Sequence, residues 1–252
     1  MTRPPQDRTP CCQTRRALLG LIGTGLSSLA TGVGTAAQAP RTPGCIVRPE
    51  QMEGPYFVEA RLRRSDIRAE RVGGAPKPGV PLHLTFRVLR FDGRRCTAVP
   101  GAVVDVWQCD ARGVYSGVRD FAGRFDTRGE QFLRGYQMTD AEGLARFVTI
   151  YPGWYPGRAV HLHFKIRTEP GAARGEAFTS QLYFDDALTD RIHSRPPYRR
   201  EGVRRTRNAD DGIFQAGGEK LILNLTRSGE SASQAGEAYA AIFDIALSGS
   251  GA

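Results

Sequence analysis

Two histidines separated by a single residue are the first sign of chemistry in this sequence. In residues 160–166, apolar side chains alternate with His161, His163 and a lysine. Residues two apart on a β-strand project from the same face, so both imidazoles would lie together, opposite the apolar side chains. Two imidazoles at this spacing can chelate one metal ion. The same pattern also fits two surface histidines on a solvated strand, and the spacing alone leaves both interpretations open.

A tyrosine-bearing turn precedes this pair. Prolines and glycines flank Tyr155 in residues 151–158, which predicts a rigid turn that presents the phenol inward. No aspartate or glutamate occurs between positions 151 and 165. A metal held here would therefore take its anionic ligands from elsewhere, and phenolate, a hard donor that suits a trivalent metal, is the obvious local candidate. Tyr151 is the other phenol in this stretch, although its position after an apolar strand indicates packing.

The sequence resembles the intradiol ring-cleavage dioxygenases of catechols, and in particular their exported members. The likeness extends over about residues 45–225, and its most specific part is the block that joins Tyr155 to the histidine pair. Three of the matching stretches carry residues that correspond to functional residues of the family. The fourth resembles the start of its exported members. These stretches are DVW and GVY within 105–115, PGWYPGR and HLHF within 152–164, SQLYF at 180–184 and CIVRPEQMEGPY at 45–56.

The resemblance implies a non-haem Fe(III) enzyme. The implied iron ligands are two tyrosines and two histidines: Tyr115, Tyr155, His161 and His163. Tyr155 would also dissociate from the metal when substrate binds and act as a base. Arg158 would stabilise charge on the substrate, and Gln181 would orient the substrate. The implied substrates are a small aromatic diol and O2. Both oxygen atoms would be inserted as the ring opens between its hydroxyl groups to a cis,cis-muconate-type product.

Two other functions fit parts of the same pattern. A predicted β-sandwich also suits a non-catalytic, transthyretin-like binding module, because one fold serves many functions. The histidine pair could instead belong to a zinc hydrolase, which would need a further histidine or carboxylate ligand and a general base. Tyr115 taken alone fits a strand-edge aromatic residue. Replacing Tyr155 with Phe would separate these hypotheses, because ring cleavage depends on that phenol and hydrolysis by a zinc enzyme does not.

Residues 1–39 have the pattern of an export signal. Basic residues precede an uncharged stretch at 17–39 that ends in Ala-Gln-Ala, a small-residue cleavage site. The sequence TRRALL within it resembles a twin-arginine signal. Five glycines between positions 20 and 34 argue against a membrane anchor. We therefore expect a periplasmic or secreted protein, with a catalytic domain at 40–252 and no integral membrane segment once the signal is removed.

Composition and turn signals predict an all-β fold. The 252 residues are 40% hydrophobic and include 30 Gly and 16 Pro, which is more typical of short strands and turns than of helices. We expect an antiparallel β-sandwich with long loops and an irregular N-terminal segment. Strands are expected within 82–89, 101–107, 131–139, 144–150, 159–166, 179–184 and 221–225. Residues 186–212 should form a long surface loop, and 235–247 fits either a helix or a last strand.

Charge and cysteine content bear on partners. The formal net charge is +9, but the arginines are scattered and form no block of five or six, so nucleic acid is not an expected partner. The chain could pair as a homodimer. An exported protein can hold a disulfide. Among Cys45, Cys96 and Cys109 the sequence leaves the pairing open and favours Cys96 with Cys109, because both lie near predicted strands.

Three further polar residues are expected to lie away from the site. His83 alternates with leucines on a predicted strand and should face solvent. His193 lies in the predicted surface loop and should have no partner. Gln108 follows Trp107, a predicted wall or core residue, and should not contact a metal.

Overall fold

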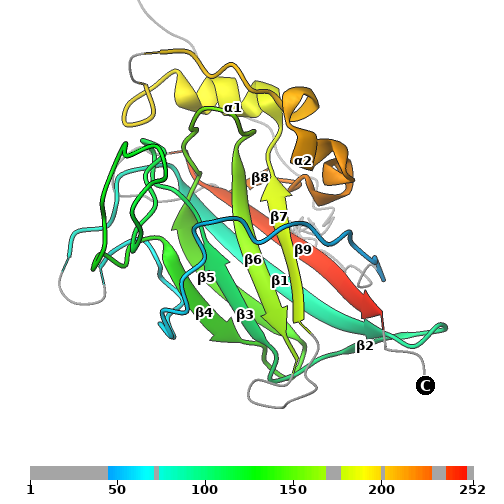
Figure 1. The fold of residues 1–252 in the computed structure, drawn as a ribbon. Coiled ribbons are helices and arrows are strands. Elements are labelled where there is room, and N and C mark those ends of the chain that lie inside the picture. Colours follow the sequence, from blue (N-terminus) through cyan, green and yellow to red (C-terminus); the bar gives the residue numbers. More distant parts are fainter. Residues whose placement is uncertain (1–44, 71–73, 169–176, 200–201, 229–236, 249–252) are drawn as a thin grey trace, which may run out of the picture. The chain divides into compact units, whose positions relative to one another are not determined.

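Two β-sheets, one of five strands and one of four, dominate the described part of the chain (Figure 1). This computed structural model describes residues 45–70, 74–168, 177–199, 202–228 and 237–248. The predicted export signal at 1–39 lies outside the described residues. The predicted all-β sandwich is confirmed. Within the described ranges, no helix is long and apolar enough to cross a membrane.

The first sheet is built around β1 (Pro81–Phe91). Its other strands are β2 (Cys96–Ala98), β5 (Leu144–Ile150), β8 (Thr226–Arg227) and β9 (Tyr239–Ser248). In β1 the alternation of the sequence is realised, because Leu82 and Leu84 are buried between the sheets whereas His83 is exposed. The prediction that His83 faces solvent is confirmed.

The second sheet has the strand order β4-β3-β6-β7 and bears the histidine pair. Its strands are β3 (Val103–Trp107), β4 (Arg134–Met138), β6 (His161–Arg167) and β7 (Ala177–Tyr183). Phe164 of β6 meets Phe86 and Phe243 of the first sheet, with ring centroids 5.1 and 5.7 Å apart. These aromatic contacts lie in the hydrophobic core between the sheets. The opposite face of β6 is therefore left for the polar residues of the strand.

The C-terminal segment is a strand, which decides between the two structures that the sequence allowed. In β9 the residues Tyr239, Ala241 and Phe243 are buried, and Ile242 between them is exposed. This period of two is that of a half-buried strand. β9 pairs in parallel with β1 along its whole length, whereas the other pairs of described strands are antiparallel.

The prediction of a long loop at 186–212 was wrong in part. Helix α1 (Asp186–His193) occupies its beginning, with the Asp185 side chain accepting a hydrogen bond from the amide of Leu188. Short helical turns follow at η1 (Asn208–Asp210), α2 (Gly212–Gln215) and η2 (Gly218–Leu221). The strand expected at 221–225 is also wrong, because there only Ile222 forms an isolated bridge, with Tyr183. Figure 1 shows α1 and α2 at one end of the sheets.

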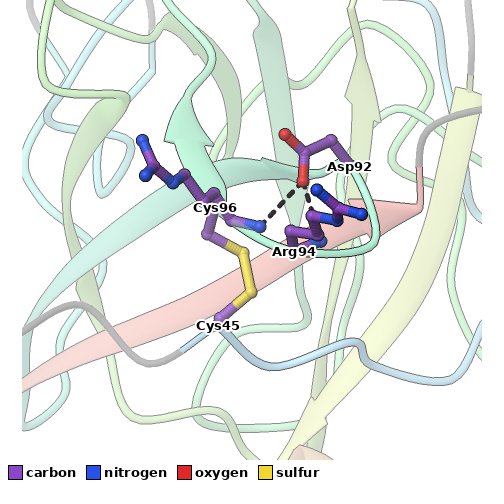
Figure 2. The surroundings of a disulfide bond; sticks show 5 residues. Cys45, Asp92, Arg94 and Cys96 are labelled. Atoms are coloured by element: carbon purple, nitrogen blue, oxygen red, sulfur yellow. Dashed lines mark hydrogen bonds between the residues drawn. A yellow bond between two sulfur atoms is a disulfide. The ribbon is translucent and has the colours of Figure 1, made fainter.

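The favoured disulfide pairing was wrong as well. Cys45 is bonded to Cys96, and their Cα atoms lie 5.7 Å apart (Figure 2). Cys96 begins β2 in the first sheet, whereas Cys109 follows β3 in the second and is buried, so the two cannot meet. Cys45 reaches Cys96 because the chain beside it pairs with β9, where the amide of Ala246 donates to the carbonyl of Ile46.

An N-terminal segment, residues 47–67, crosses the second sheet from β7 to β4. The amide of Gln51 donates to the carbonyl of Thr179 in β7, and that of Arg64 donates to the carbonyl of Tyr136 in β4. In Figure 1 this segment is the blue coil that runs across the front of the arrows. It covers the polar face of the sheet, which makes a buried site possible there.

Candidate metal centre

β6 places both imidazoles on the covered face of the second sheet. His161 is paired across the strands with Tyr183, and His163 is paired with Trp107 and Gln181. Both histidines are buried, with 1% and 2% of their surface exposed. Their Nε2 atoms lie 3.0 Å apart. The prediction that the two imidazoles project together is confirmed, and the alternative of a solvated strand face is wrong.

The surroundings of each imidazole fix its orientation. His161 Nδ1 lies 2.7 Å from the carbonyl oxygen of Ala159, and because a carbonyl can only accept, Nδ1 must carry the proton. The lone pair of His161 is therefore on Nε2. The ring of His163 stacks on Trp107, with centroids 5.0 Å apart and planes inclined by 8°. Gly54 packs closely against the same ring, since a Cβ there would lie 3.2 Å from His163 Cε1.

Two phenols reach the same nitrogen. The Oη of Tyr155 lies 3.0 Å from His161 Nε2, and the Oη of Tyr115 lies 3.4 Å from it. Tyr115 is fully buried, whereas Tyr155 is partly exposed. The reading of Tyr115 as an isolated strand-edge aromatic is therefore wrong, because it packs into the same cluster as the histidines.

Two glycines let the tyrosine-bearing loops approach each other backbone to backbone. Gly113 has a φ of +81°, and a Cβ on it would lie 2.3 Å from the carbonyl oxygen of Trp154. A Cβ on Gly153 would lie 2.4 Å from the carbonyl oxygen of Asp110, to which the Gly153 amide donates a hydrogen bond. Only glycine fits either position. These contacts bring Tyr155 and Tyr115 together from chain positions forty residues apart.

The predicted catalytic residues join the same cluster. Arg158 Nη1 lies 3.4 Å from His161 Nε2, and Nη2 donates to Gln181 Oε1 at 2.5 Å. Gln181 Nε2 donates to the carbonyl of Met52 in the covering segment. The structure thus brings together all six residues that the sequence singled out for the site.

Burial sets the charge state of these groups. Removal from water lowers the pKa of both His161 and His163 well below the ordinary value, and the nearby Arg158 lowers each further. Both imidazoles are therefore neutral at neutral pH and able to act as ligands. Burial also raises the pKa of the Tyr115 and Tyr155 phenols, with Arg158 opposing the rise. The phenols need a bound cation to ionise.

The four donors fit a single metal ion. Ligand atoms bound about 2.1 Å from one ion lie roughly 3 Å apart when they are neighbours, and the separations from His161 Nε2 match this. Two neutral imidazoles and two phenols, which would bind as phenolates, suit a hard, trivalent ion. Among the described residues no group of three or more His, Cys, Asp or Glu side chains gathers, which is the set that a zinc hydrolase would use.

Comparison with known proteins identifies the family. A family model described as dioxygenase, Dioxygenase_C, matches residues 52–249. The chain belongs to the intradiol ring-cleavage dioxygenase family. It is 28% identical over 196 residues to chlorocatechol 1,2-dioxygenase of Pseudomonas putida, covering 70% of this chain and 66% of that protein. It is 37% identical over 122 residues to the protocatechuate 3,4-dioxygenase beta chain of Burkholderia cepacia, covering 44% and 48%.

The intradiol fold is also found in a solved structure. An intradiol ring-cleavage dioxygenase from Tetranychus urticae superposes with a TM-score of 0.67 and 33% identity, covering 82% of this chain and 97% of that one. The chain thus spans about half to two thirds of the curated relatives that it matches, but nearly all of this structure. Intradiol dioxygenases are known to use non-haem iron.

Other residues singled out in the sequence lie away from the cluster. Tyr151 is packed, and its Oη lies 2.6 Å from Thr189 Oγ1. Gln108 is buried, and its Nε2 donates to the carbonyl of Ile150. The prediction that Tyr151 is packed is confirmed. The prediction for His193 was wrong, because its Nε2 lies 2.9 Å from the carbonyl of Pro152 and its ring stacks on Tyr198 in the turn after α1.

Sequence reasoning missed three residues that shape the site. Asp211 accepts a hydrogen bond from Arg158 Nε at 2.9 Å. Tyr56 stacks on Tyr115, with ring centroids 4.6 Å apart. Gly54 packs on His163. Asp211 lies in a stretch without periodicity and gives no local signal, whereas Tyr56 and Gly54 belong to a stretch that already resembled the family.

Proposed function

We propose that this chain is a non-haem Fe(III) intradiol dioxygenase. It inserts both atoms of O2 into a catechol-type diol and opens the ring between the hydroxyl groups, giving a cis,cis-muconate-type product. The observation that supports this most is the convergence of Tyr115, Tyr155 and His163 on His161 Nε2. A non-catalytic binding module has no need to bury four such donors beside the guanidinium of Arg158.

The two phenols and two imidazoles would hold the ferric ion. When bound, ferric iron would accept the diol oxygens and withdraw electron density from the ring, which makes a ring carbon reactive toward O2. Around it, His161 and His163 present neutral nitrogens whose orientation is fixed by a carbonyl and by stacking. The fully buried Tyr115 supplies a ligand that water cannot reach.

Tyr155 is suited to act as a base because it is the more accessible of the two phenols. A diol must lose two protons to bind as a dianion. A phenolate at Tyr155 can accept one of them at Oη and then move away as a neutral phenol, while a hydroxide ion from the solvent would take the other and become water. The partial exposure of Tyr155, in a turn whose next residues Pro156 and Gly157 are exposed, leaves room for that change.

Arg158 and Gln181 act on the substrate from the edge of the cluster. The Arg158 side chain is 17% exposed, so it borders both the buried donors and the accessible edge. Burial alone would lower the pKa of this guanidinium, but Tyr155 and Asp211 outweigh burial and the pKa lies above its ordinary value. A fixed cation in a water-poor site stabilises negative charge that develops on the substrate. Gln181, held by Met52 and Arg158, orients the diol.

We further propose that the protein is exported through residues 1–39 and acts in the periplasm or outside the cell. The disulfide between Cys45 and Cys96 supports this, because such bonds persist in oxidising compartments. Replacing both Arg15 and Arg16 with Lys should leave the unprocessed chain in the cytoplasm, as measured by fractionation and mass spectrometry. Unchanged export and processing would contradict the twin-arginine route.

The visible absorption spectrum of the purified mature protein, with iron quantified on the same sample, tests the function. We expect one iron per chain and a broad tyrosinate-to-Fe(III) charge-transfer band that shifts when a catechol is added without O2. Catechol, chlorocatechol and protocatechuate form the first panel for turnover, because the relatives are named for two of these. A colourless protein after ferric loading would overturn the proposal. Co-purified zinc would then favour a hydrolase, and its absence a binding module.

A further inference from the structure

Asp211 connects the guanidinium of Arg158 to a helical turn. Its side chain is buried, with 2% of the residue exposed. One carboxylate oxygen, Oδ2, accepts from Arg158 Nε at 2.9 Å and from the backbone amide of Ala159 at 2.8 Å. The other, Oδ1, accepts from the amide of Ile213 at 2.8 Å in the first turn of α2. One oxygen therefore holds Arg158 and Ala159, and the other caps α2.

A second nitrogen of the guanidinium is held by side-chain amides and a phenol. Arg158 Nη2 donates to Gln181 Oε1, which also accepts from Tyr183 Oη at 3.2 Å. Tyr183 Oη lies 2.9 Å from Gln51 Oε1, and Gln51 Nε2 donates to the carbonyl of Ile213. The single hydroxyl proton of Tyr183 is shared between these two amide oxygens, and the polar contacts connect Arg158 back to the first turn of α2.

The same carboxylate also acts on a histidine through the backbone. Asp211 fixes the amide of Ala159, and the carbonyl of Ala159 accepts the Nδ1 proton of His161. The position of the His161 ring is thus set by the residue that Asp211 anchors. An arginine side chain has several rotatable bonds, and a charge-assisted hydrogen bond to Nε restricts them more strongly than a neutral one.

We propose that Asp211 is the positioning residue of this site. It holds Arg158 so that Nη1 lies beside His161 Nε2, where the substrate would bind, and it holds the turn that presents His161. The proposal rests on the proposed function, because Arg158 matters only if charge develops on a substrate beside it. Asp211 contacts neither the iron donors nor the substrate in this role and acts through Arg158 and Ala159.

The test is a double-mutant cycle of Asp211→Asn with Arg158→Gln in the iron-loaded, full-length mature protein. Asp211→Asn keeps an acceptor for the cap of α2 but loses the charged acceptor of Arg158 Nε. We expect kcat to fall about ten- to hundredfold with KM changed less than threefold, which is the loss of one charge-assisted hydrogen bond made in the transition state. The double variant should be no slower than Arg158→Gln alone.

A spectroscopic measurement accompanies the kinetics. In Asp211→Asn the charge-transfer band of the anaerobic substrate complex should shift in the same direction as in Arg158→Gln, with iron content per chain unchanged. Asp185→Asn is the matched control, because Asp185 caps α1 in the same way without contacting Arg158, and it should change neither kcat nor the band. If Asp211→Asn does not fold, Asp211→Ser, which retains a capping hydroxyl, takes its place in the cycle.

The outcomes separate this proposal from the function itself. A wild-type protein without iron and turnover overturns both. The wild type could be active while the fold losses of kcat in Asp211→Asn and Arg158→Gln multiply in the double variant. That result overturns the positioning role alone. An equal loss of kcat in Asp185→Asn does the same, because it would show a general effect of losing a helix cap.

Discussion

The two tyrosines of the centre differ in how firmly the chain holds them. Tyr115 is fully buried under the ring of Tyr56, and the next residue, Ser116, accepts a hydrogen bond at Oγ from the buried Arg134. Tyr155 is partly exposed and lies in a turn that continues into exposed residues. Both phenols nevertheless reach His161 Nε2. The difference is consistent with the proposed roles of Tyr115 as a permanent ligand and of Tyr155 as a ligand that leaves.

The physical cause of this difference lies in the supporting residues. Tyr56 is itself held by Asp120, because its hydroxyl donates a hydrogen bond of 2.5 Å to the Asp120 carboxylate. Asp120 in turn is paired with Arg124. A chain of packed and hydrogen-bonded side chains therefore stands behind Tyr115. Tyr155 depends on the proline and glycine residues of its own turn and on the approach of Gly113.

Replacing Tyr155 with Phe should have the largest effect on turnover. Loss of the phenol removes the proposed base, so kcat should fall about 10²- to 10⁴-fold, while the other three donors still retain iron. Steady-state kinetics and iron analysis on the same sample provide the measurement. Turnover within tenfold of the wild type would show that this phenol is not the base.

Replacing Tyr115 with Phe should act on iron retention instead. The substitution removes a fully buried proposed ligand that no water can replace, so iron should bind at least about tenfold more weakly. Competition with a chelator measures this, and the folded fraction is monitored by circular dichroism. If Tyr115→Phe holds iron as tightly as Tyr155→Phe, the two phenols are equivalent and the comparison fails.

Gly113→Ala should weaken the contact between the two tyrosine loops. The new methyl group would meet the carbonyl of Trp154, and the residue would also be strained at its positive φ. Gly123→Ala is the matched control, because Gly123 has a φ of +70° with no atom within 4 Å of the added carbon. Urea unfolding should show Gly113→Ala less stable than the control by about 1–3 kcal/mol. Equal stabilities would mean that the loops adjust freely.

Asp120→Asn should have the smallest effect and tests the support of Tyr115. Hydrogen bonds from Arg124 hold the pKa of the Asp120 carboxyl well below its ordinary value of 3.8. A lowered pKa in the folded state stabilises the protein at pH values above 3.8, and this contribution is lost as the pH falls through the folded-state pKa. The wild type should therefore unfold at a higher temperature than Asp120→Asn at pH 7, and the gap should narrow below pH 3.8. A gap independent of pH would rule out this charge effect.

Local patterns predicted the parts of the molecule that depend on near neighbours. The alternation around His161 and His163 fixes which side chains share a face, because a strand has a period of two. The run of prolines and glycines around Tyr155 fixes a turn in the same way. Both predictions are confirmed by the positions of these residues.

Other features could not be predicted because their causes lie far away in the chain. Cys45 can bond to Cys96, 51 residues away in the sequence, only because the chain beside Cys45 pairs with β9. The parallel pairing of β9 with β1 likewise joins the first and last of the described strands. Helix α1 was missed because its short sequence, DALTDRIH, is mostly polar and buries only Thr189 and Ile192.

The sequence by itself therefore determined which residues could bind a metal and which of them share a strand or a turn. Only the tertiary structure decided that Tyr115 is locked and Tyr155 accessible, since burial depends on Tyr56 and the covering segment. It also decided that Asp211, 53 positions beyond Arg158, is the residue that holds this guanidinium. Hydrogen bonds and close packing act over a few ångströms in space, whatever the separation in the chain.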